Sequence, residues 1–218
     1  ILSNWDRAIE QTEKLIEKKQ LLKKGLMQQL LSGKVRFKNY YKSWDIVKMS
    51  DVFQETRDIN SHNHSHPIMT ISAKHGLLTQ EKKFDKVIAG NSLKKYTLLH
   101  KGDFAYNKGN SKTYPMGCIY QLDEPSALVP FVYICFKPRN NVYSRFYRHW
   151  FLNHGLDRQL KRIITSSARN DGLLNVSRNN FFKLKVPYPS IEEQKAISQV
   201  LDKIDKEIDR KSTRLNSS

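Results

Sequence analysis

One nine-residue pattern occurs twice, near the start of the chain and near its end. Residues 2–10 and residues 201–209 both read Leu-x-x-apolar-Asp-basic-x-Ile-acidic, and they lie 199 positions apart. Apolar residues at this spacing are typical of an amphipathic helix. The sequence therefore predicts two helices of one type that bracket a middle of different character, as in one period of a tandem repeat. Two unrelated helices that agree by chance are the alternative.

The first helix is predicted over residues 3–32, with Gly33 just after its end. Its apolar stripe keeps helical spacing as far as Ile16 and then continues, after a shift, at Leu22. Such a long helix cannot bury its stripe alone, so it needs a partner helix, most simply an antiparallel one.

The second helix is predicted over residues 190–208. Ser190 and Glu193 form a capping box, in which each side chain accepts a hydrogen bond from a free backbone N–H of the other residue. The heptad spacing stops at Asp209. Residues 209–218 resemble an in-frame translation of a sequencing-library adaptor, so we interpret them as an artefact tail outside the fold, with a genuine polar tail as the alternative. The residues predicted to pack the two helices together are Trp5, Ile9, Ile16, Leu22, Leu26, Ile197, Leu201, Ile204 and Ile208.

The middle of the chain, residues 38–189, has a different character. Short β-branched and aromatic runs separated by turn signals predict strands. These runs lie at 46–47, 68–71, 97–99, 118–120 and, as one long run, 128–136. One amphipathic helix is predicted near 143–162, with an aromatic stripe that we assign to the core. The sequence thus predicts an α+β fold, a globular domain flanked by long coiled-coil-type helices.

The two cysteines, Cys118 and Cys135, lie in apolar β-type runs. We interpret them as reduced core thiols of a cytoplasmic protein, with a disulfide between neighbouring strands as the alternative. The sequence contains no run of about 18 apolar residues that could span a bilayer, and no signal peptide is recognisable in it.

The charge of the chain is strongly positive. Its 38 Lys and Arg residues against 21 Asp and Glu residues give a net charge of +17. A cation of this size suits a polyanion, and nucleic acid is the first candidate, ahead of a membrane surface.

Common catalytic motifs are missing from the sequence. It has no Gly-rich phosphate loop, no Cys-x-x-Cys pair, no His-Glu-x-x-His and no Gly-x-Ser-x-Gly. Residues 186–189 (VPYP) lack the acidic or Asn residue that an amino-methyltransferase motif needs. His62, His64 and His66 could approach a metal from one face of an extended segment, but a polar turn explains them as well. We therefore predict no catalytic, metal or cofactor site, and an autonomous nuclease is disfavoured.

Two basic, polar segments are candidates for contact with double-stranded DNA. Lys and Arg can hold phosphates, while Asn, Ser, Thr and Tyr can read base edges in the major groove. The candidate residues are Lys108, Asn110, Ser111, Lys112 and Tyr114 in the first segment, and Lys161, Arg162, Ser166, Arg169 and Asn170 in the second. Two solvated surface loops are the alternative interpretation.

Three segments carry a resemblance to one known family. Residues 26–37 (LMQQLLSGKVRF) resemble the end of that family's long conserved helix. Trp44, followed by Ser50-Asp51-Val52, resembles the opening of its target-recognition domain. Pro187, Pro189, Glu192-Glu193-Gln194 and Ile197 resemble the entry to its next conserved helix. The chain is identified on these segments as similar to the specificity (HsdS) subunits of type I restriction–modification enzymes.

The resemblance implies a specificity subunit without catalytic chemistry of its own. In that family two target-recognition domains each read one half of a split DNA site, and an antiparallel pair of conserved helices holds them apart. Methyltransferase subunits dock on the specificity subunit, and nuclease–translocase subunits join them. Adenine methylation with S-adenosylmethionine and DNA cleavage take place in those partners.

On this resemblance, residues 1–37 are the C-terminal part of the first spacer helix, 38–189 one target-recognition domain, and 190–208 the start of the second conserved helix. We interpret the chain as part of a truncated gene, with a natural half-sized subunit that pairs with itself as an alternative. A coiled-coil protein-interaction adaptor without sequence-specific DNA readout is the competing function. An even scatter of the basic residues would favour that adaptor.

Overall fold

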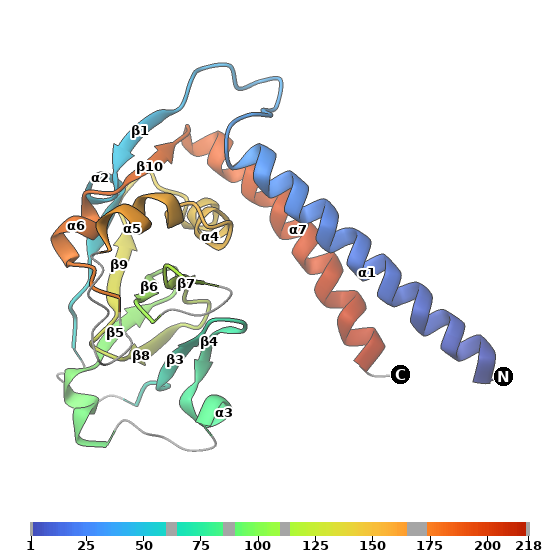
Figure 1. Cartoon of the computed structure of the whole chain (residues 1–218), viewed down its shortest axis with the longest axis horizontal. Helices are drawn as coiled ribbons and strands as arrows, with labels where there is room; N and C mark the ends of the chain where they lie inside the picture. Colours follow the sequence, from blue (N-terminus) through green and yellow to red (C-terminus); the bar gives the residue numbers. More distant parts are fainter. Residues whose placement is uncertain (1, 60–64, 85–89, 110–113, 165–173, 217–218) are drawn as a thin grey trace. The chain divides into compact units, whose positions relative to one another are not determined.

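The computed structural model describes residues 2–59, 65–84, 90–109, 114–164 and 174–216 (Figure 1). The chain divides into two compact units, which are described separately. The helical unit comprises Ile1–Trp44 and Pro189–Ser218, and the α+β unit comprises Asp45–Tyr188. The mixture of long helices with a sheet-containing unit confirms the predicted fold class. None of the helices in the described ranges has an apolar stretch that could cross a bilayer.

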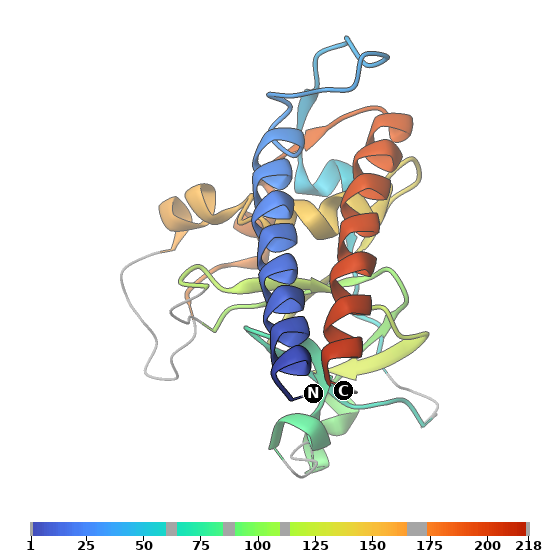
Figure 2. The ribbon, with the colours of Figure 1, turned by 90° about the vertical axis from the view of Figure 1, so that its right-hand side faces the viewer.

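The helical unit is an antiparallel pair of long helices, α1 (Leu2–Leu30) and α7 (Ile191–Asn216). Figure 2 shows the first residues of α1 and the last residues of α7 at the same end of the pair. Two ion pairs set the register: Lys19 Nζ lies 2.5 Å from Glu207 Oε2, and Lys23 pairs with Asp205. Positions along α1 rise as positions along α7 fall, which confirms the antiparallel partner that the apolar stripe predicted.

The stripe of α1 runs without the predicted shift. Leu22 lies off it and is 55% exposed, so the packing role predicted for Leu22 is wrong. Lys19 and Lys23 occupy the stripe instead, because their aliphatic stems cover apolar surface while their ammonium groups reach carboxylates on α7. The continuous stripe consists of Trp5, Ile9, Thr12, Ile16, Lys19, Lys23, Leu26 and Leu30.

Burial along the two stripes increases toward the connected end of the pair. Trp5 is 61% exposed and Ile9 is 37% exposed, so the packing predicted for them is not seen within this chain. Leu30, Ile197 and Leu201 are buried. The remaining predicted packing positions, Ile16, Leu26, Ile204 and Ile208, are half-buried.

The start of α7 keeps only half of the predicted capping box. The backbone N–H of Glu193 donates to Ser190 Oγ at 3.3 Å, as predicted. The carboxylate of Glu193 instead accepts hydrogen bonds from Arg36 and Trp44. At its other end α7 continues to Asn216, whereas the sequence analysis ended this helix at residue 208.

The α+β unit is built from short elements. Its strands are β1 (Asp45–Lys48), β2 (Phe53–Glu55), β3 (Met69–Ser72), β4 (Gly76–Thr79), β5 (Thr97–His100), β6 (Phe104–Asn107), β7 (Cys118–Gln121), β8 (Ser126–Val129), β9 (Ile134–Pro138) and β10 (Lys185–Tyr188). Its helices are α2 (Met49–Val52), α3 (Gln80–Phe84), η1 (Gly90–Lys95), α4 (Ser144–Leu152), α5 (Asp157–Ile163) and α6 (Arg178–Phe182). In the described ranges, the largest sheet has the antiparallel order β2-β9-β6-β7, and β1–β10, β3–β4 and β5–β8 form pairs.

Two predicted elements are each divided in the structure. The apolar run 128–136 forms β8 and β9, because Pro130 begins a turn in which the Tyr133 N–H donates to the Pro130 carbonyl at 3.0 Å. The helix predicted over 143–162 forms α4 and α5, with a break at His154, whose φ is +60°. Strands β2, β4, β6 and β10 were not predicted from the sequence.

The central sheet separates two cores by simple alternation of side chains. On one face Phe104 and Phe136 stack at 5.3 Å, and both rings pack against Phe53 and Phe151. Four aromatic residues of α4 are buried, which confirms that its stripe is core. The alternate residues of the same strands point to the other face, where Ala105, Cys118 and Cys135 pack with Met69, Ile71 and Leu99.

Both cysteines are buried free thiols, as predicted. They lie on β7 and β9, which are separated by β6 in the sheet. Burial raises the pKa of Cys118 to about 11 and that of Cys135 to about 12, so both thiols are protonated at neutral pH.

Candidate nucleic-acid interface

The positive charge is shared between the two units in proportion to their lengths. The α+β unit, residues 45–188, carries 22 Lys and Arg against 11 Asp and Glu, a net +11 over 144 residues. The helical unit, residues 1–44 and 189–218, carries 16 against 10, a net +6 over 74 residues. The charge of each unit therefore does not favour DNA readout over the coiled-coil adaptor, and only the arrangement of the basic residues on the surface can distinguish the two.

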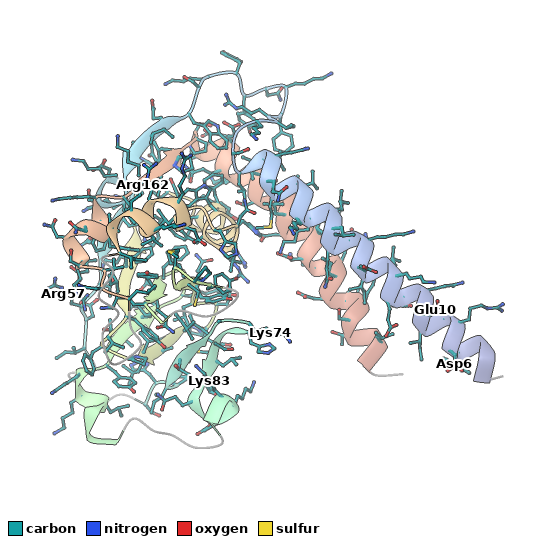
Figure 3. All side chains as sticks on the ribbon, in the orientation of Figure 1. Asp6, Glu10, Arg57, Lys74, Lys83 and Arg162 are labelled. Carbon is teal, nitrogen blue, oxygen red and sulfur yellow. The ribbon has the colours of Figure 1, made fainter. Side chains whose placement is uncertain are left out.

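Helix α5 carries a group of three cations on one side. Arg158, Lys161 and Arg162 are exposed, and their spacing of three and four residues places them on one side of the helix. Leu160 is buried on the other side. Figure 3 labels Arg162 within the α+β unit. The sequence analysis identified Lys161 and Arg162 but missed Arg158, whose spacing from Lys161 was the available signal.

A side-chain amide attaches α5 to strand β10. Gln159 Nε2 donates to the carbonyl oxygen of Lys185 at 2.7 Å, and the Lys185 N–H donates to Gln159 Oε1 at 2.9 Å. Gln159 thus makes the two hydrogen bonds that a neighbouring strand would make. This pair fixes the rotation of α5, so its basic side stays exposed.

The start of the first candidate segment is bonded to a residue that follows the second. The Leu174 N–H donates to the Lys108 carbonyl at 2.9 Å. Lys108, which is half-buried, begins the first segment, and Leu174 is the first described residue after the second. No local sequence pattern predicts this contact, because 66 positions separate the two residues.

Tyr114, at the end of the first segment, is held by aromatic contacts. Its ring stacks on His154 with centroids 4.9 Å apart, and it meets Tyr120 edge-on at 6.3 Å. His154 Nδ1 lies 2.8 Å from the Asp157 carboxylate at the start of α5. The first segment therefore contacts Leu174, beyond the second segment, at Lys108, and the break before α5 at Tyr114.

Six of the predicted DNA-contact residues lie outside the described residues, so the structure does not test them. They are Asn110, Ser111, Lys112, Ser166, Arg169 and Asn170. Lys108, Tyr114, Lys161 and Arg162 are described, and the contacts above bring the backbone of both segments into one region.

A second group of cations is partly neutralised. Glu55 accepts hydrogen bonds from Arg57 at 2.8 Å and from Arg178 at 2.5 Å. Burial alone would raise the pKa of Glu55, but the two guanidinium groups outweigh burial and leave that pKa below its ordinary value. One carboxylate thus offsets half of the charge of this pair, whereas Arg158, Lys161 and Arg162 form no ion pair with another described residue.

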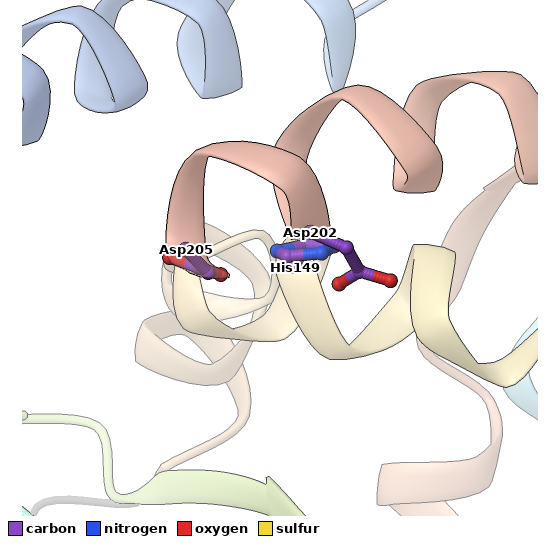
Figure 4. A group of neighbouring side chains, drawn as sticks. All are labelled: His149, Asp202 and Asp205. Atoms are coloured by element: carbon purple, nitrogen blue, oxygen red, sulfur yellow. The ribbon is translucent and has the colours of Figure 1, made fainter. Parts of the chain in front are cut away.

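The structure assigns no metal site to the histidine-rich segment. His62 and His64 lie outside the described residues, and His66 Nδ1 is 2.9 Å from Ser126 Oγ. Figure 4 draws His149 of the α+β unit with Asp202 and Asp205 of the helical unit.

Comparison with known proteins gives one family and one fold. The family model described as "Type I restriction modification DNA specificity domain" matches residues 41–217. The S subunit of a type I restriction–modification system from M. genitalium is similar with a TM-score of 0.63 and 17% identity, over 99% of this chain and 55% of that one. The HsdS subunit from Thermoanaerobacter tengcongensis is similar with a TM-score of 0.58 and 13% identity, over 98% of this chain and 50% of that one. The chain thus spans about half the length of these solved structures.

Proposed function

Because the chain belongs to the type I restriction–modification DNA specificity family, we propose that its α+β unit reads one half of a split double-stranded DNA target. The unit binds the duplex in a sequence-specific way and directs the enzymes that act on it. It is proposed to contribute no catalytic group and no cofactor, since adenine methylation with S-adenosylmethionine and DNA cleavage belong to partner subunits.

One observation supports this proposal: both described ends of the first candidate segment contact residues that flank the second. Lys108 is bonded to Leu174, Tyr114 is stacked on His154, and His154 faces Asp157 in the first turn of α5. A surface that reads DNA needs cations to hold phosphates close to polar groups that reach base edges. In this proposal the polar residues of the two segments lie close to the cations of α5.

The two kinds of residue have different roles in this proposal. Arg158, Lys161 and Arg162 contact phosphates and supply affinity that depends on salt, because binding releases counterions from the DNA. Segments 108–114 and 161–170 supply the residues that read bases in the major groove. Affinity and sequence preference are therefore separable by mutation.

The helical unit is proposed to be the spacer that sets the distance to a second recognition domain. Its antiparallel helices give it a fixed register, through Lys19 with Glu207 and Lys23 with Asp205. Methyltransferase subunits dock on the assembled specificity subunit in this proposal, and nuclease–translocase subunits join them. The chain is one of two recognition halves of that assembly.

The proposal is tested by selection from a DNA pool. The full chain is incubated with 40-base-pair duplexes that have a randomised centre, and bound duplexes are amplified and sequenced over several rounds. We expect one short motif to be enriched, and the dissociation constant for that motif to rise steeply with NaCl concentration. Binding without any enriched motif, or no binding at low salt, would contradict the proposal and favour the coiled-coil adaptor.

A further inference from the structure

Helix α4 ends in a Schellman motif with an unusual residue at its key position. The Gly155 N–H donates to the Trp150 carbonyl at 3.1 Å, and the His154 N–H donates to the Phe151 carbonyl at 3.0 Å. This pattern places His154 at the left-handed position that follows the helix, where its φ is +60°. Glycine is the usual residue there, because it has no Cβ to clash with the backbone.

The side chain of His154 makes the contacts that a glycine could not. Its Nδ1 faces the Asp157 carboxylate at 2.8 Å, and since an ionised carboxylate can only accept, Nδ1 carries the hydrogen. The face of the imidazole ring stacks on the ring of Tyr114, with the two ring centroids 4.9 Å apart and an angle of 24° between the ring planes. Asp157 thus sets the orientation of the imidazole, and the imidazole supports Tyr114.

Tyr114 in turn begins a tight turn on the way to β7. The Gly117 N–H donates to the Tyr114 carbonyl at 3.1 Å. Gly117 has a φ of +76°, and a Cβ there would lie 2.5 Å from the Asn107 carbonyl oxygen, so this turn has little freedom to move. The ring of Tyr114 is therefore held between a rigid turn and His154.

We propose that His154 is a positioning residue for DNA sequence readout, which acts by holding Tyr114 at the end of segment 108–114. This inference rests on the proposed function. A left-handed conformation in a residue other than glycine is retained only where its surroundings over-determine it, and such positions gather at functional sites. At position 154 the contacts of the imidazole offset this strain, because glycine would adopt the same backbone conformation without it.

The first experiment measures the position of Tyr114 without DNA. Amide exchange of Gly117 is followed by NMR in the full chain, in the wild type and in the variant His154→Gly. The variant keeps the favoured backbone of the helix end and removes only the ring, so α4 stays folded. We expect exchange of the Gly117 amide to accelerate by about tenfold or more, because the Tyr114 carbonyl loses its support. The thermal midpoint of the variant should equal or exceed that of the wild type.

A matched control comes from the same α+β unit. Asn141 also has a positive φ, of 64°, and its carbonyl accepts a hydrogen bond from Tyr188 on β10. Asn141→Gly relieves the same backbone conformation elsewhere, so it should leave Gly117 exchange within about twofold of the wild type. Tyr114→Phe, which keeps the stacked ring, should also leave exchange unchanged, whereas Tyr114→Ala should accelerate it as His154→Gly does.

The second experiment measures sequence preference with the randomised 40-base-pair duplex pool. For His154→Gly we expect the preference for the wild-type motif over the unselected pool to fall by about tenfold. The dissociation constant for the unselected pool should change by less than about twofold, because the cations on α5 are intact.

The outcomes separate this inference from the proposed function. If Gly117 exchange in His154→Gly equals that of the wild type, the positioning role is wrong, whatever the DNA results are. If exchange accelerates but the motif and its preference are unchanged, His154 holds Tyr114 but the role in readout is overturned. If the wild type enriches no motif while exchange accelerates as expected, the proposed function fails and the link to readout fails with it, whereas the structural support of Tyr114 stands.

Discussion

Arg36 and Glu193 form a two-point ion pair that joins the segment after α1 to the first turn of α7. Arg36 Nε and Nη2 donate to the two carboxylate oxygens of Glu193 at 2.8 and 2.7 Å. Trp44 Nε1 donates to the same carboxylate at 2.9 Å, and the guanidinium lies 5.8 Å from the centre of the Trp44 ring. The Glu193 side chain is only 2% exposed, so it depends fully on these partners.

Removal of Glu193 should destabilise the helical unit strongly. In Glu193→Ala, Arg36 keeps its charge but loses its partner, and breaking such a pair costs about 3 kcal/mol. Thermal unfolding followed by circular dichroism of the helices measures the loss. Glu10→Ala is the matched control, because Glu10 pairs with Lys14 on the surface and both side chains are more than half exposed. That control should cost less than about 0.5 kcal/mol, and equal losses in both variants would contradict the role given to Glu193.

The pair between Lys23 and Asp205 should define the helix register. Lys23→Asp places two carboxylates together, and we expect a loss of about 1 kcal/mol in the free energy of unfolding at low salt. Adding Asp205→Lys should restore most of that loss, because the swapped charges attract again. Urea unfolding at 0.05 M and 1 M NaCl measures both effects, which should shrink at high salt. No recovery in the double variant would place the helices in another register.

The sequence predicted the helical pair well but missed its seam at two positions. Antiparallel pairing follows from stripes that neither helix can bury alone. A stripe that contains Lys19 and Lys23 looks interrupted in the sequence, so Leu22 was assigned to it instead. Only the positions of Glu207 and Asp205 on the partner helix show that lysines belong there.

Neutralisation of the basic side of α5 should reduce the salt dependence of DNA binding. Each of Arg158→Gln, Lys161→Gln and Arg162→Gln is expected to lower the slope of log K against log salt by about 0.9 if its side chain contacts one phosphate. The loss should be equal for all DNA sequences. Lys74→Gln is the control, since Figure 3 shows Lys74 on a different part of the α+β unit from Arg162. A similar change of slope for Lys74→Gln would mean that no particular surface binds the backbone.

Gln159 should matter for DNA binding although it carries no charge. Gln159→Ala removes both hydrogen bonds to Lys185, which should cost about 1 kcal/mol of stability and release the rotation of α5. We expect weaker binding to the selected motif in fluorescence anisotropy. Gln54→Ala, at an exposed position of β2, should leave both quantities unchanged. Wild-type affinity in Gln159→Ala would show that α5 is held by packing alone.

The buried thiols should give the chain a stability that falls at alkaline pH. An ordinary thiol has a pKa near 8.5 when unfolded, whereas burial raises the pKa of Cys118 to about 11 and of Cys135 to about 12. Between these values the folded state holds more protons than the unfolded state, so the free energy of unfolding decreases as the pH rises above about 8.5.

Thiol labelling with a disulfide reagent at pH 8 tests the same burial. Both cysteines should be unreactive in the folded chain and react fully in urea. Substitution of both cysteines by alanine should reduce the alkaline loss of stability, while buried tyrosines such as Tyr106 leave part of it. Rapid labelling of the folded chain would contradict the assigned burial.

The sequence predicted the chemistry of the candidate site but not its geometry. Its chemistry was visible, because Lys161 and Arg162 stand in a run of polar and basic residues. Its geometry was not, since the bond between Lys108 and Leu174 joins distant positions and the break at His154 interrupts a helical pattern that looks continuous. Local patterns report which groups are available, whereas tertiary contacts decide which of them meet.

The amide of Gln159 has a consequence beyond the placement of α5. Strand β10 pairs with β1 on one side, and its other side would present free backbone groups at Lys185 if Gln159 did not bond to both of them. Free backbone groups on a strand edge can recruit a strand from another molecule and start aggregation. Gln159 closes that edge together with Tyr147, whose hydroxyl donates to the Pro187 carbonyl at 2.8 Å. The residue that orients the basic helix thus also helps to protect the unit against self-association.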